Sequence, residues 1–196
     1  MKFTRQHLAF IVAALILIAG FVSWKQAGSP PPSKPLAAGE VLRTYEVAGY
    51  GLSFEYSPYY YLASRDAGSA ARPQRAVVLI EDTPLHRDLV EGRATEWVGE
   101  GPTVITVDAF ENPEGYSVEE WLREATNWKL ATSDLMPVSV GGAAGVAFTW
   151  TGLYEGKSAV VTHGGRIFVF SVTWLTPEDR ILADFDALLA SAKFSL

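Results

Sequence analysis

An uncharged apolar segment near the N-terminus constrains this chain more than any other feature. Leu8–Trp24 reads LAFIVAALILIAGFVSW and contains no charged side chain. At about 1.5 Å per residue, a helix of this length spans roughly 25 Å, the short end of a bilayer core. Lys2 and Arg5 precede the segment, and Lys25 follows it directly. The sequence therefore predicts a transmembrane helix within residues 1–24.

A cleaved signal peptide is the alternative interpretation of this segment. A cut after Ala27 would place Lys25 at the −3 position, where small residues are preferred, so we expect the segment to be retained. Basic residues are nearly balanced on its two sides, but the short basic tail before it favours a cytoplasmic N-terminus. We therefore expect a single-pass membrane protein whose C-terminal domain is extracytoplasmic.

Residues 25–39 form a Pro-rich linker and residues 40–196 remain for one globular domain. Pro30–Pro32 favours the extended polyproline II conformation, which makes a semi-rigid spacer. The remaining length is sufficient for a hydrophobic core without disulfide bonds or metals. The chain has no cysteine, which excludes a disulfide framework, thiolate chemistry and a cysteine-linked lipid anchor.

The charge of the domain excludes some classes of partner. The chain has 16 Lys and Arg against 22 Asp and Glu. Lys2, Arg5 and Lys25 precede every acidic residue, so 13 basic residues face 22 acidic ones in the rest of the chain. An acidic domain does not bind a polyanion by counterion release, so we expect no nucleic-acid partner.

Short runs typical of β-strands dominate the domain, while residues 63–74 are small and polar and predict a mobile loop. Tyr59–Leu62 is interpreted as a continuation of the second strand. Gly164-Gly165 predicts a hairpin turn between two apolar strands. The fold class is α+β, with an antiparallel sheet of about six strands flanked by helices. The expected strands are 44–47, 52–56, 76–81, 103–110, 138–140, 146–151, 158–163 and 167–174.

Two helices are predicted from capping signals and apolar periodicity. Ser117 and Glu120 form a capping box before an apolar face. The second helix follows Thr176 as N-cap and Pro177 at the first helical position. A helical turn is a further possibility within the ambiguous residues 82–101. The apolar positions are Val118, Trp121, Leu122 and Ala125 in the first helix, Ile181, Leu182, Phe185, Leu188, Leu189 and Ala192 in the second, and Leu85, Leu89 and Val90 in the possible turn.

The order of these segments resembles bacterial PsbP-like domains over residues 44–196. The resemblance is carried by GLSFEYSP, EEWL, AGVAFTW with GLYEG, GGRIFVFSV and the terminal FDALLASAKF. It implies an antiparallel sheet sandwiched by helices, and partner binding rather than catalysis. Members include the lumenal extrinsic subunit of photosystem II and a nuclear import factor that binds a small GTPase. No manganese, chloride or photosystem contact residue is matched, so none is assigned.

No motif supports a catalytic, cofactor or metal site. Thr151–Ser158 reads TGLYEGKS, but its first glycine is one position too late for a phosphate loop and a strand follows it, so it predicts a hairpin turn. His163 precedes two glycines, as in an esterase oxyanion segment, but the chain lacks the GxSxG nucleophile elbow. The sequence shows no metal-ligand spacing around His86 or His163. We therefore expect no catalytic residue, cofactor or metal.

The interaction hypothesis depends on exposed aromatic and turn residues. If Tyr59, Tyr60 and Tyr61 are extended, at least one ring points outward and can mark a binding site. Packing of the rings under the adjacent loop is the alternative. With His163 and Arg166 in the hairpin, they are the candidate interaction residues. A groove near 59–61 or 163–166 would favour the hypothesis.

The sequence leads to two functional hypotheses. The favoured one is a non-enzymatic interaction module, held at the membrane through residues 8–24, with a protein or envelope partner. The alternative is an enzyme or small-ligand-binding protein whose site is assembled from scattered residues such as His163, Glu155 and Asp108.

Overall fold

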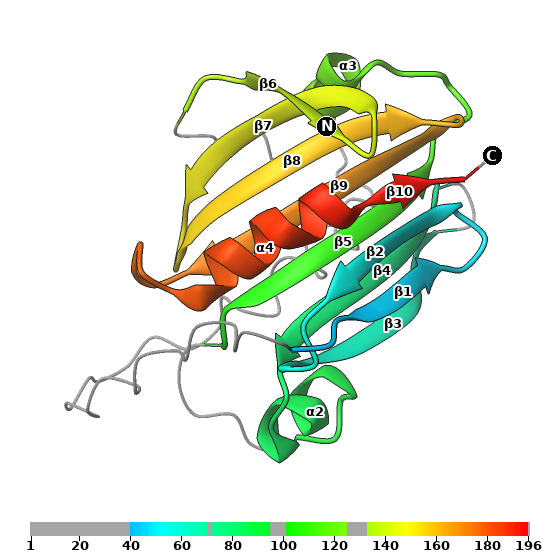
Figure 1. The fold of residues 1–196 in the computed structure, drawn as a ribbon. Helices are drawn as coiled ribbons and strands as arrows, with labels where there is room; N and C mark the ends of the chain where they lie inside the picture. The colour runs from blue at the N-terminus through cyan, green and yellow to red at the C-terminus, as the bar shows by residue number, and fades with distance from the viewer. Residues whose placement is uncertain (1–39, 70–71, 95–100, 125–132, 196) are drawn as a thin grey trace, which may run out of the picture.

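Two antiparallel sheets form the framework of the domain (Figure 1). The computed structural model describes residues 40–69, 72–94, 101–124 and 133–195. The larger sheet contains β3 (Tyr60–Ser69), β4 (Arg72–Glu81), β5 (Val104–Glu111), β6 (Met136–Val140), β7 (Ala143–Thr151), β8 (Glu155–His163) and β9 (Arg166–Trp174). The smaller sheet contains β1 (Arg43–Val47), β2 (Leu52–Tyr56) and β10 (Lys193–Phe194). Their orders are β3-β4-β5-β9-β8-β7-β6 and β1-β2-β10.

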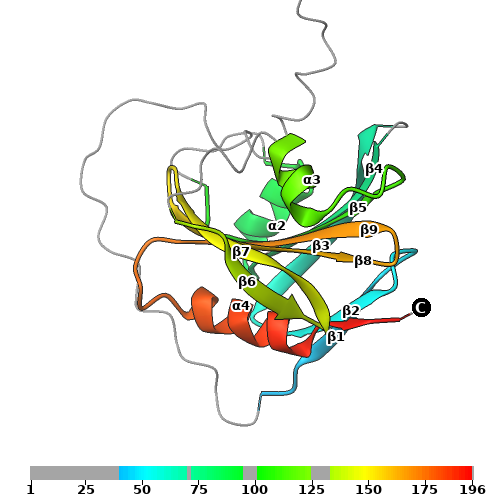
Figure 2. The same cartoon turned by 90° about the horizontal axis from the view of Figure 1, so that it is seen from above.

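Helices cover the larger sheet on both faces. They are α2 (Pro84–Val90), α3 (Val118–Glu124) and α4 (Arg180–Ser191). Viewed from above, α3 lies over one face, while α4 and the smaller sheet lie over the other (Figure 2). Phe168 and Phe170 of β9 pack with Phe185 of α4 in the main core, and Ile167 packs in a second cluster under α3. Both faces of β9 therefore carry buried apolar side chains.

The helix α3 begins as its capping box predicts. Ser117 N donates to Glu120 Oε2 over 2.8 Å, and Glu120 N donates to Ser117 Oγ over 3.2 Å. Trp121 packs on Phe110, with 5.3 Å between the ring centroids. Leu122 is buried in the cluster under the helix. Ala125, the last position of the predicted apolar face, lies outside the described residues.

The strands are antiparallel as predicted, but they form two sheets, one of seven strands and one of three, instead of one sheet of about six. Two local predictions are also wrong. Residues 63–69 and 72–74, expected to belong to a loop, instead contribute to β3 and β4, with Ala63 opposite Val78 and Ser69 opposite Arg72. Tyr59–Leu62 does not continue β2 either. The chain turns directly after Ser57, and Tyr60 begins β3 in the larger sheet. Small polar residues suit β3 because it lies at the sheet edge, where little apolar burial is needed.

The helix α4 begins three residues later than its first predicted helical position, Pro177. Its N-cap is Asp179, and Thr176 and Pro177 precede the helix. The carboxylate of Asp179 accepts hydrogen bonds from Leu175 N and Thr176 N, at 2.7 and 3.1 Å. Together with the hydrogen bond from Asp179 N to Thr176 O at 3.0 Å, these contacts close a turn before the helix, so α4 begins at Arg180.

Strand register defines two ends of the larger sheet. Trp174 lies opposite Glu155, near the point where the described chain begins at Glu40; we call this the proximal end. Arg166 lies opposite Glu111 and His163 at the other end, the distal end. In the described ranges, no helix has the length and hydropathy needed to cross a bilayer. The expected transmembrane segment and linker lie outside those ranges.

Candidate functional site

The structure separates the five candidate interaction residues. His163 and Arg166 flank the β8–β9 turn at the distal end. Tyr59 and Tyr60 lie at the proximal end, in and directly after the turn that leads into β3. Tyr61 lies beside α2, where Arg87 stacks over its ring at 5.0 Å and Glu91 accepts a hydrogen bond from its hydroxyl. The five residues therefore lie in two separate polar regions, one at each end of the larger sheet.

A groove is present at the distal end, and we call it the distal groove. Its volume is about 280 Å³, and it is open to solvent. Small-molecule sites usually enclose roughly 300–1,000 Å³, so this groove suits one or two side chains of a partner better than an enclosed ligand. The lining residues are Asn112, Gly115, Tyr116, Thr162, His163, Gly164, Gly165 and Arg166.

Asn112 joins the two loops that form the groove. Its backbone N–H donates to Gly165 O over 3.0 Å. Its side chain accepts from Tyr116 N and donates to Tyr116 O, at 3.0 and 2.9 Å. Asn112 is 8% exposed, so these bonds also satisfy a buried amide. Asn112 and Tyr116 are not among the five candidate interaction residues that the sequence indicates. The Asn-Pro-Glu-Gly turn at 112–115 is the signal that points to a side-chain-capped loop here.

The opposite wall of the groove is held by charge and ring contacts. Arg166 Nε donates to Glu111 Oε1 over 3.1 Å, and its guanidinium lies 5.2 Å from the ring centre of Tyr50. Burial raises the pKa of Tyr50, and the negative charge of Glu111 acts in the same direction. His163 stacks on Phe194 with 4.6 Å between ring centroids. These contacts fix the positions of the Arg166 and His163 side chains in the wall.

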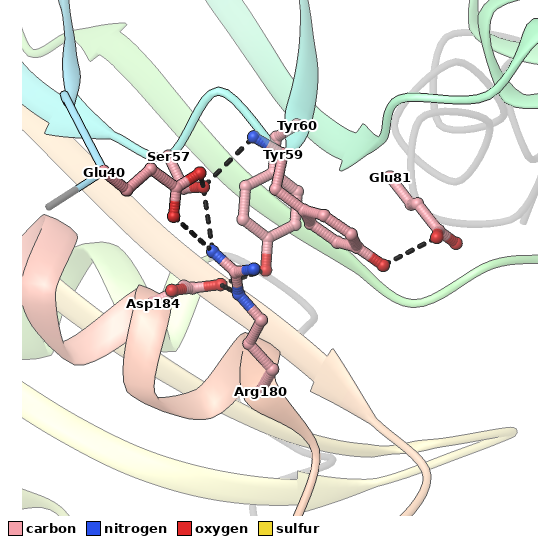
Figure 3. A network of polar contacts seen from close by, with 7 residues as sticks. All are labelled: Glu40, Ser57, Tyr59, Tyr60, Glu81, Arg180 and Asp184. Carbon is pink, nitrogen blue, oxygen red and sulfur yellow. Dashed lines mark hydrogen bonds and ion pairs between the residues drawn. The ribbon is translucent and has the colours of Figure 1, made fainter. Parts of the chain in front are cut away.

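A network of polar contacts centred on Arg180 occupies the proximal end (Figure 3). We call it the Arg180 network. Arg180 Nη2 donates to Ser57 Oγ over 2.9 Å and to Glu40 Oε2 over 3.2 Å. Its Nε donates to Asp184 Oδ2 over 2.8 Å, one turn along α4. The arginine therefore joins the first described residue, the β2–β3 turn and the start of α4.

Two tyrosines complete the Arg180 network. Tyr60 donates its hydroxyl to Asp184 Oδ2 over 2.6 Å, and Tyr59 donates to Glu81 Oε1 over 2.6 Å. Burial raises the pKa of both hydroxyls, and the hydrogen bonds to carboxylates raise each further. The guanidinium of Arg180 lies 4.6 Å from the ring centre of Tyr59. Donors and acceptors are matched to one another, which is typical of a structural network rather than of a reactive site.

The three residues named for a scattered site are not brought together. Glu155 and His163 begin and end β8, roughly 26 Å apart at the rise of a β-strand. Asp108 alternates with the core-facing Val107 and Ala109 of β5, so it points to the sheet face that α3 covers. His163 instead contacts Phe194, which packs on the main core. Within the described ranges, no group of three His, Asp or Glu side chains could hold a metal ion.

Asp108 has a strongly perturbed carboxyl group. Burial raises its pKa to about 6, against the hydrogen bond from Gln74 Nε2 at 2.7 Å and the positive charge of Arg65. The pKa of Asp108 in the folded state thus exceeds the ordinary aspartate value of 3.8. Protonation of Asp108 stabilises the fold fully below about pH 4, and this contribution is lost as the pH rises through about 6.

Asp108→Asn is therefore expected to raise the free energy of unfolding at pH 7 by about 1–2 kcal/mol. The neutral amide avoids the cost of a buried carboxylate and can still accept from Gln74. Urea denaturation at pH 7 and pH 4, followed by tryptophan fluorescence, measures the effect. The increase in the free energy of unfolding should be much smaller at pH 4, where the wild-type carboxyl is already protonated. An equal change at both pH values would contradict this account.

The antiparallel sheets and their three described helices form a PsbP-like fold. The structure is similar to the solution structure of cyanobacterial PsbP (CyanoP) from Synechocystis sp. PCC 6803, with a TM-score of 0.52 and 14% sequence identity. The similarity covers 85% of this chain and 100% of that chain. No family model and no curated protein matches the sequence. The resemblance to PsbP-like domains is thus confirmed at the level of the fold.

Proposed function

We propose that this chain is a non-enzymatic interaction module, tethered to a membrane through residues 8–24, that binds a protein partner through the distal groove. The observation that carries the proposal is the position of the groove. It lies at the end of the sheet opposite Glu40, the residue that directly follows the linker. A tether entering at the proximal end leaves the groove accessible from the extracytoplasmic side.

The chemistry of the groove supports binding rather than catalysis. His163 contacts a phenylalanine ring, and Arg166 is paired with Glu111, so the two side chains have packing roles in the wall. The separation of Glu155 and Asp108 from His163 disfavours the alternative enzyme or ligand carrier. The PsbP-like fold agrees with an accessory or binding role.

Tyr116 is the best residue with which to test partner binding. Tyr116 lines the groove, while its hydrogen bonds to Asn112 are made by backbone atoms that a substitution retains. Tyr116→Ala should therefore keep the loop and remove an aromatic contact. We expect at least about tenfold weaker capture of the partner, as for aromatic hot spots. The measurement is photo-crosslinking of the tagged full-length chain in membranes, with the crosslinker placed at Thr162.

A matched control separates the groove from the rest of the surface. Ala144 is exposed on β7, outside the groove, and a crosslinker there should not trap the same partner. Identical crosslinked products from Ala144 and Thr162, or full capture by Tyr116→Ala, would reject the distal groove as the binding site.

A further inference from the structure

The proximal end exposes apolar side chains that the core does not use. Six large hydrophobic residues of the described chain are exposed, and five of them lie at this end. We call these five the proximal apolar surface. They are Val41, Leu42, Leu85, Leu153 and Leu175, with exposed fractions from 38% for Leu42 to 84% for Val41. Single exposed leucines are ordinary, but their concentration at one end of a sheet indicates a contact surface.

Four separate segments contribute to the proximal apolar surface. Val41 and Leu42 precede β1, and Leu85 lies on α2 directly after β4. Leu153 lies in the β7–β8 turn and Leu175 directly after β9, and the pairing of Glu155 with Trp174 brings these two connections to the same edge. The side chains thus project from loop tips and a short helix, which suits insertion into a soft surface better than docking into a pocket.

We propose that the proximal apolar surface lies on the bilayer and inserts these side chains among the lipid headgroups. The inference rests on the membrane tether of the proposed function. Residues 25–39 reach at most roughly 50 Å when fully extended, so the tether keeps this end close to the lipid. Tethering raises the effective concentration of the surface to the millimolar range, so weak insertion is sufficient.

The charges near this surface permit contact with neutral lipid. Carboxylates are numerous here, but three arginines pair with many of them. Arg87 bonds Asp82 at 2.7 Å, Arg93 bonds Asp88 at 2.7 Å, and Arg180 bonds Asp184 and Glu40. Among the described residues at this end, basic side chains do not outnumber carboxylates, so no basic excess attracts anionic lipid. The surface therefore fits a zwitterionic bilayer.

Partly exposed aromatic residues stand beside the leucines. Trp174 directly precedes Leu175, and Trp150 lies at the end of β7 near Leu153. Tryptophan is enriched at membrane interfaces, where its ring contacts both headgroups and acyl chains. At the distal end, none of the large hydrophobic residues is exposed among those described. This difference between the two ends gives the domain one orientation on the membrane, with the distal groove directed away from it.

Site-specific fluorescent labels test the orientation directly. The chain has no cysteine, so Gly152→Cys, beside Leu153, or Glu178→Cys, three residues after Leu175, gives a single labelling site without removing either leucine. The full-length chain is reconstituted into phosphatidylcholine vesicles that carry a doxyl-labelled lipid, and an environment-sensitive label is attached. We expect several-fold stronger quenching at these sites than at Glu114→Cys, which is exposed at the distal end.

Removal of the leucines should weaken the quenching by the doxyl-labelled lipid. Leu153→Ser combined with Leu175→Ser is expected to lower the ratio of docked to undocked domain by about tenfold or more, seen as loss of quenching at Glu178→Cys. Both leucines are about half exposed, so the fold should survive, as tryptophan fluorescence will verify.

The possible failures are distinguishable. Vesicle flotation reports the tether, and a chain that does not float would remove both the proposed function and this inference. A chain that floats but shows equal, weak quenching at all three labels keeps the tether and overturns lipid docking. That outcome would assign the surface to a protein partner instead.

Discussion

Arg180→Met is expected to lower the free energy of unfolding by about 3–5 kcal/mol. The side chains of Arg180 and Asp184 are each 8% exposed, and that of Glu40 is 16% exposed. Removing the guanidinium leaves two carboxylates with little water and no opposing charge. Breaking a buried pair is much more costly than the pair itself is stabilising, because the remaining charge must be desolvated alone. Urea denaturation of the purified full-length chain in mild detergent measures the loss.

A second ion pair, between β8 and α4, provides the control. Lys157 Nζ bonds Asp186 at 2.9 Å, but both side chains are substantially exposed. Lys157→Met should cost less than about 1 kcal/mol, because water screens surface pairs. Arg180→Lys should give an intermediate loss, since an ammonium cannot span the same set of acceptors. If Arg180→Met and Lys157→Met lowered the free energy of unfolding equally, the Arg180 network would not be what holds Glu40 against α4.

Gly145→Ala is expected to destabilise the protein by about 3 kcal/mol or more. Gly145 lies in β7 between Val138 of β6 and Val161 of β8. An added Cβ would overlap the carbonyl oxygen of Val160 and approach Val161 Cγ1 to 2.8 Å. A backbone carbonyl within a sheet cannot rotate away as a flexible side chain can. The two strands would therefore separate and lose ladder hydrogen bonds.

Gly152→Ala is the matched control for this prediction. Gly152 belongs to the same hairpin, in the β7–β8 turn, and its nearest neighbour to an added Cβ is the Trp150 ring at 3.9 Å. That is an ordinary van der Waals distance, so the change in stability should stay within about 0.5 kcal/mol. Thermal unfolding followed by circular dichroism compares the two variants. A similar melting temperature for both would show that the β7–β8 pairing tolerates the additional methyl group.

Part of the candidate site could be predicted from sequence. His163 and Arg166 flank two glycines between apolar strands, and that pattern determines a turn that presents both residues at one end of a hairpin. Tyr116 and Asn112 were not assigned because they belong to another loop, which reaches the hairpin only when β5 pairs with β9. The partner role of the five candidate residues stays a prediction.

The transmembrane helix, linker and orientation also stay predictions, because those residues lie outside the described ranges. In β9 the alternation between the two faces is marked by large apolar side chains at consecutive positions, such as Ile167 and Phe168. In β3 the same alternation is weak, because Ala63, Ser64 and Gly68 carry little apolar surface. Its strand conformation comes from pairing with β4.

Local sequence by itself determined the elements whose signals lie within a few residues of one another. The capping box of α3, the Gly164-Gly165 turn and the apolar stripe of α4 are of this kind, since each depends on hydrogen bonds or periodicity along one short segment. Tertiary structure alone decided the division into two sheets, the close approach at Gly145 and the Arg180 network. Glu40 and Arg180 are 140 residues apart, and a pairwise contact at that separation leaves no local pattern. Such contacts exist only after apolar burial has already brought the segments together.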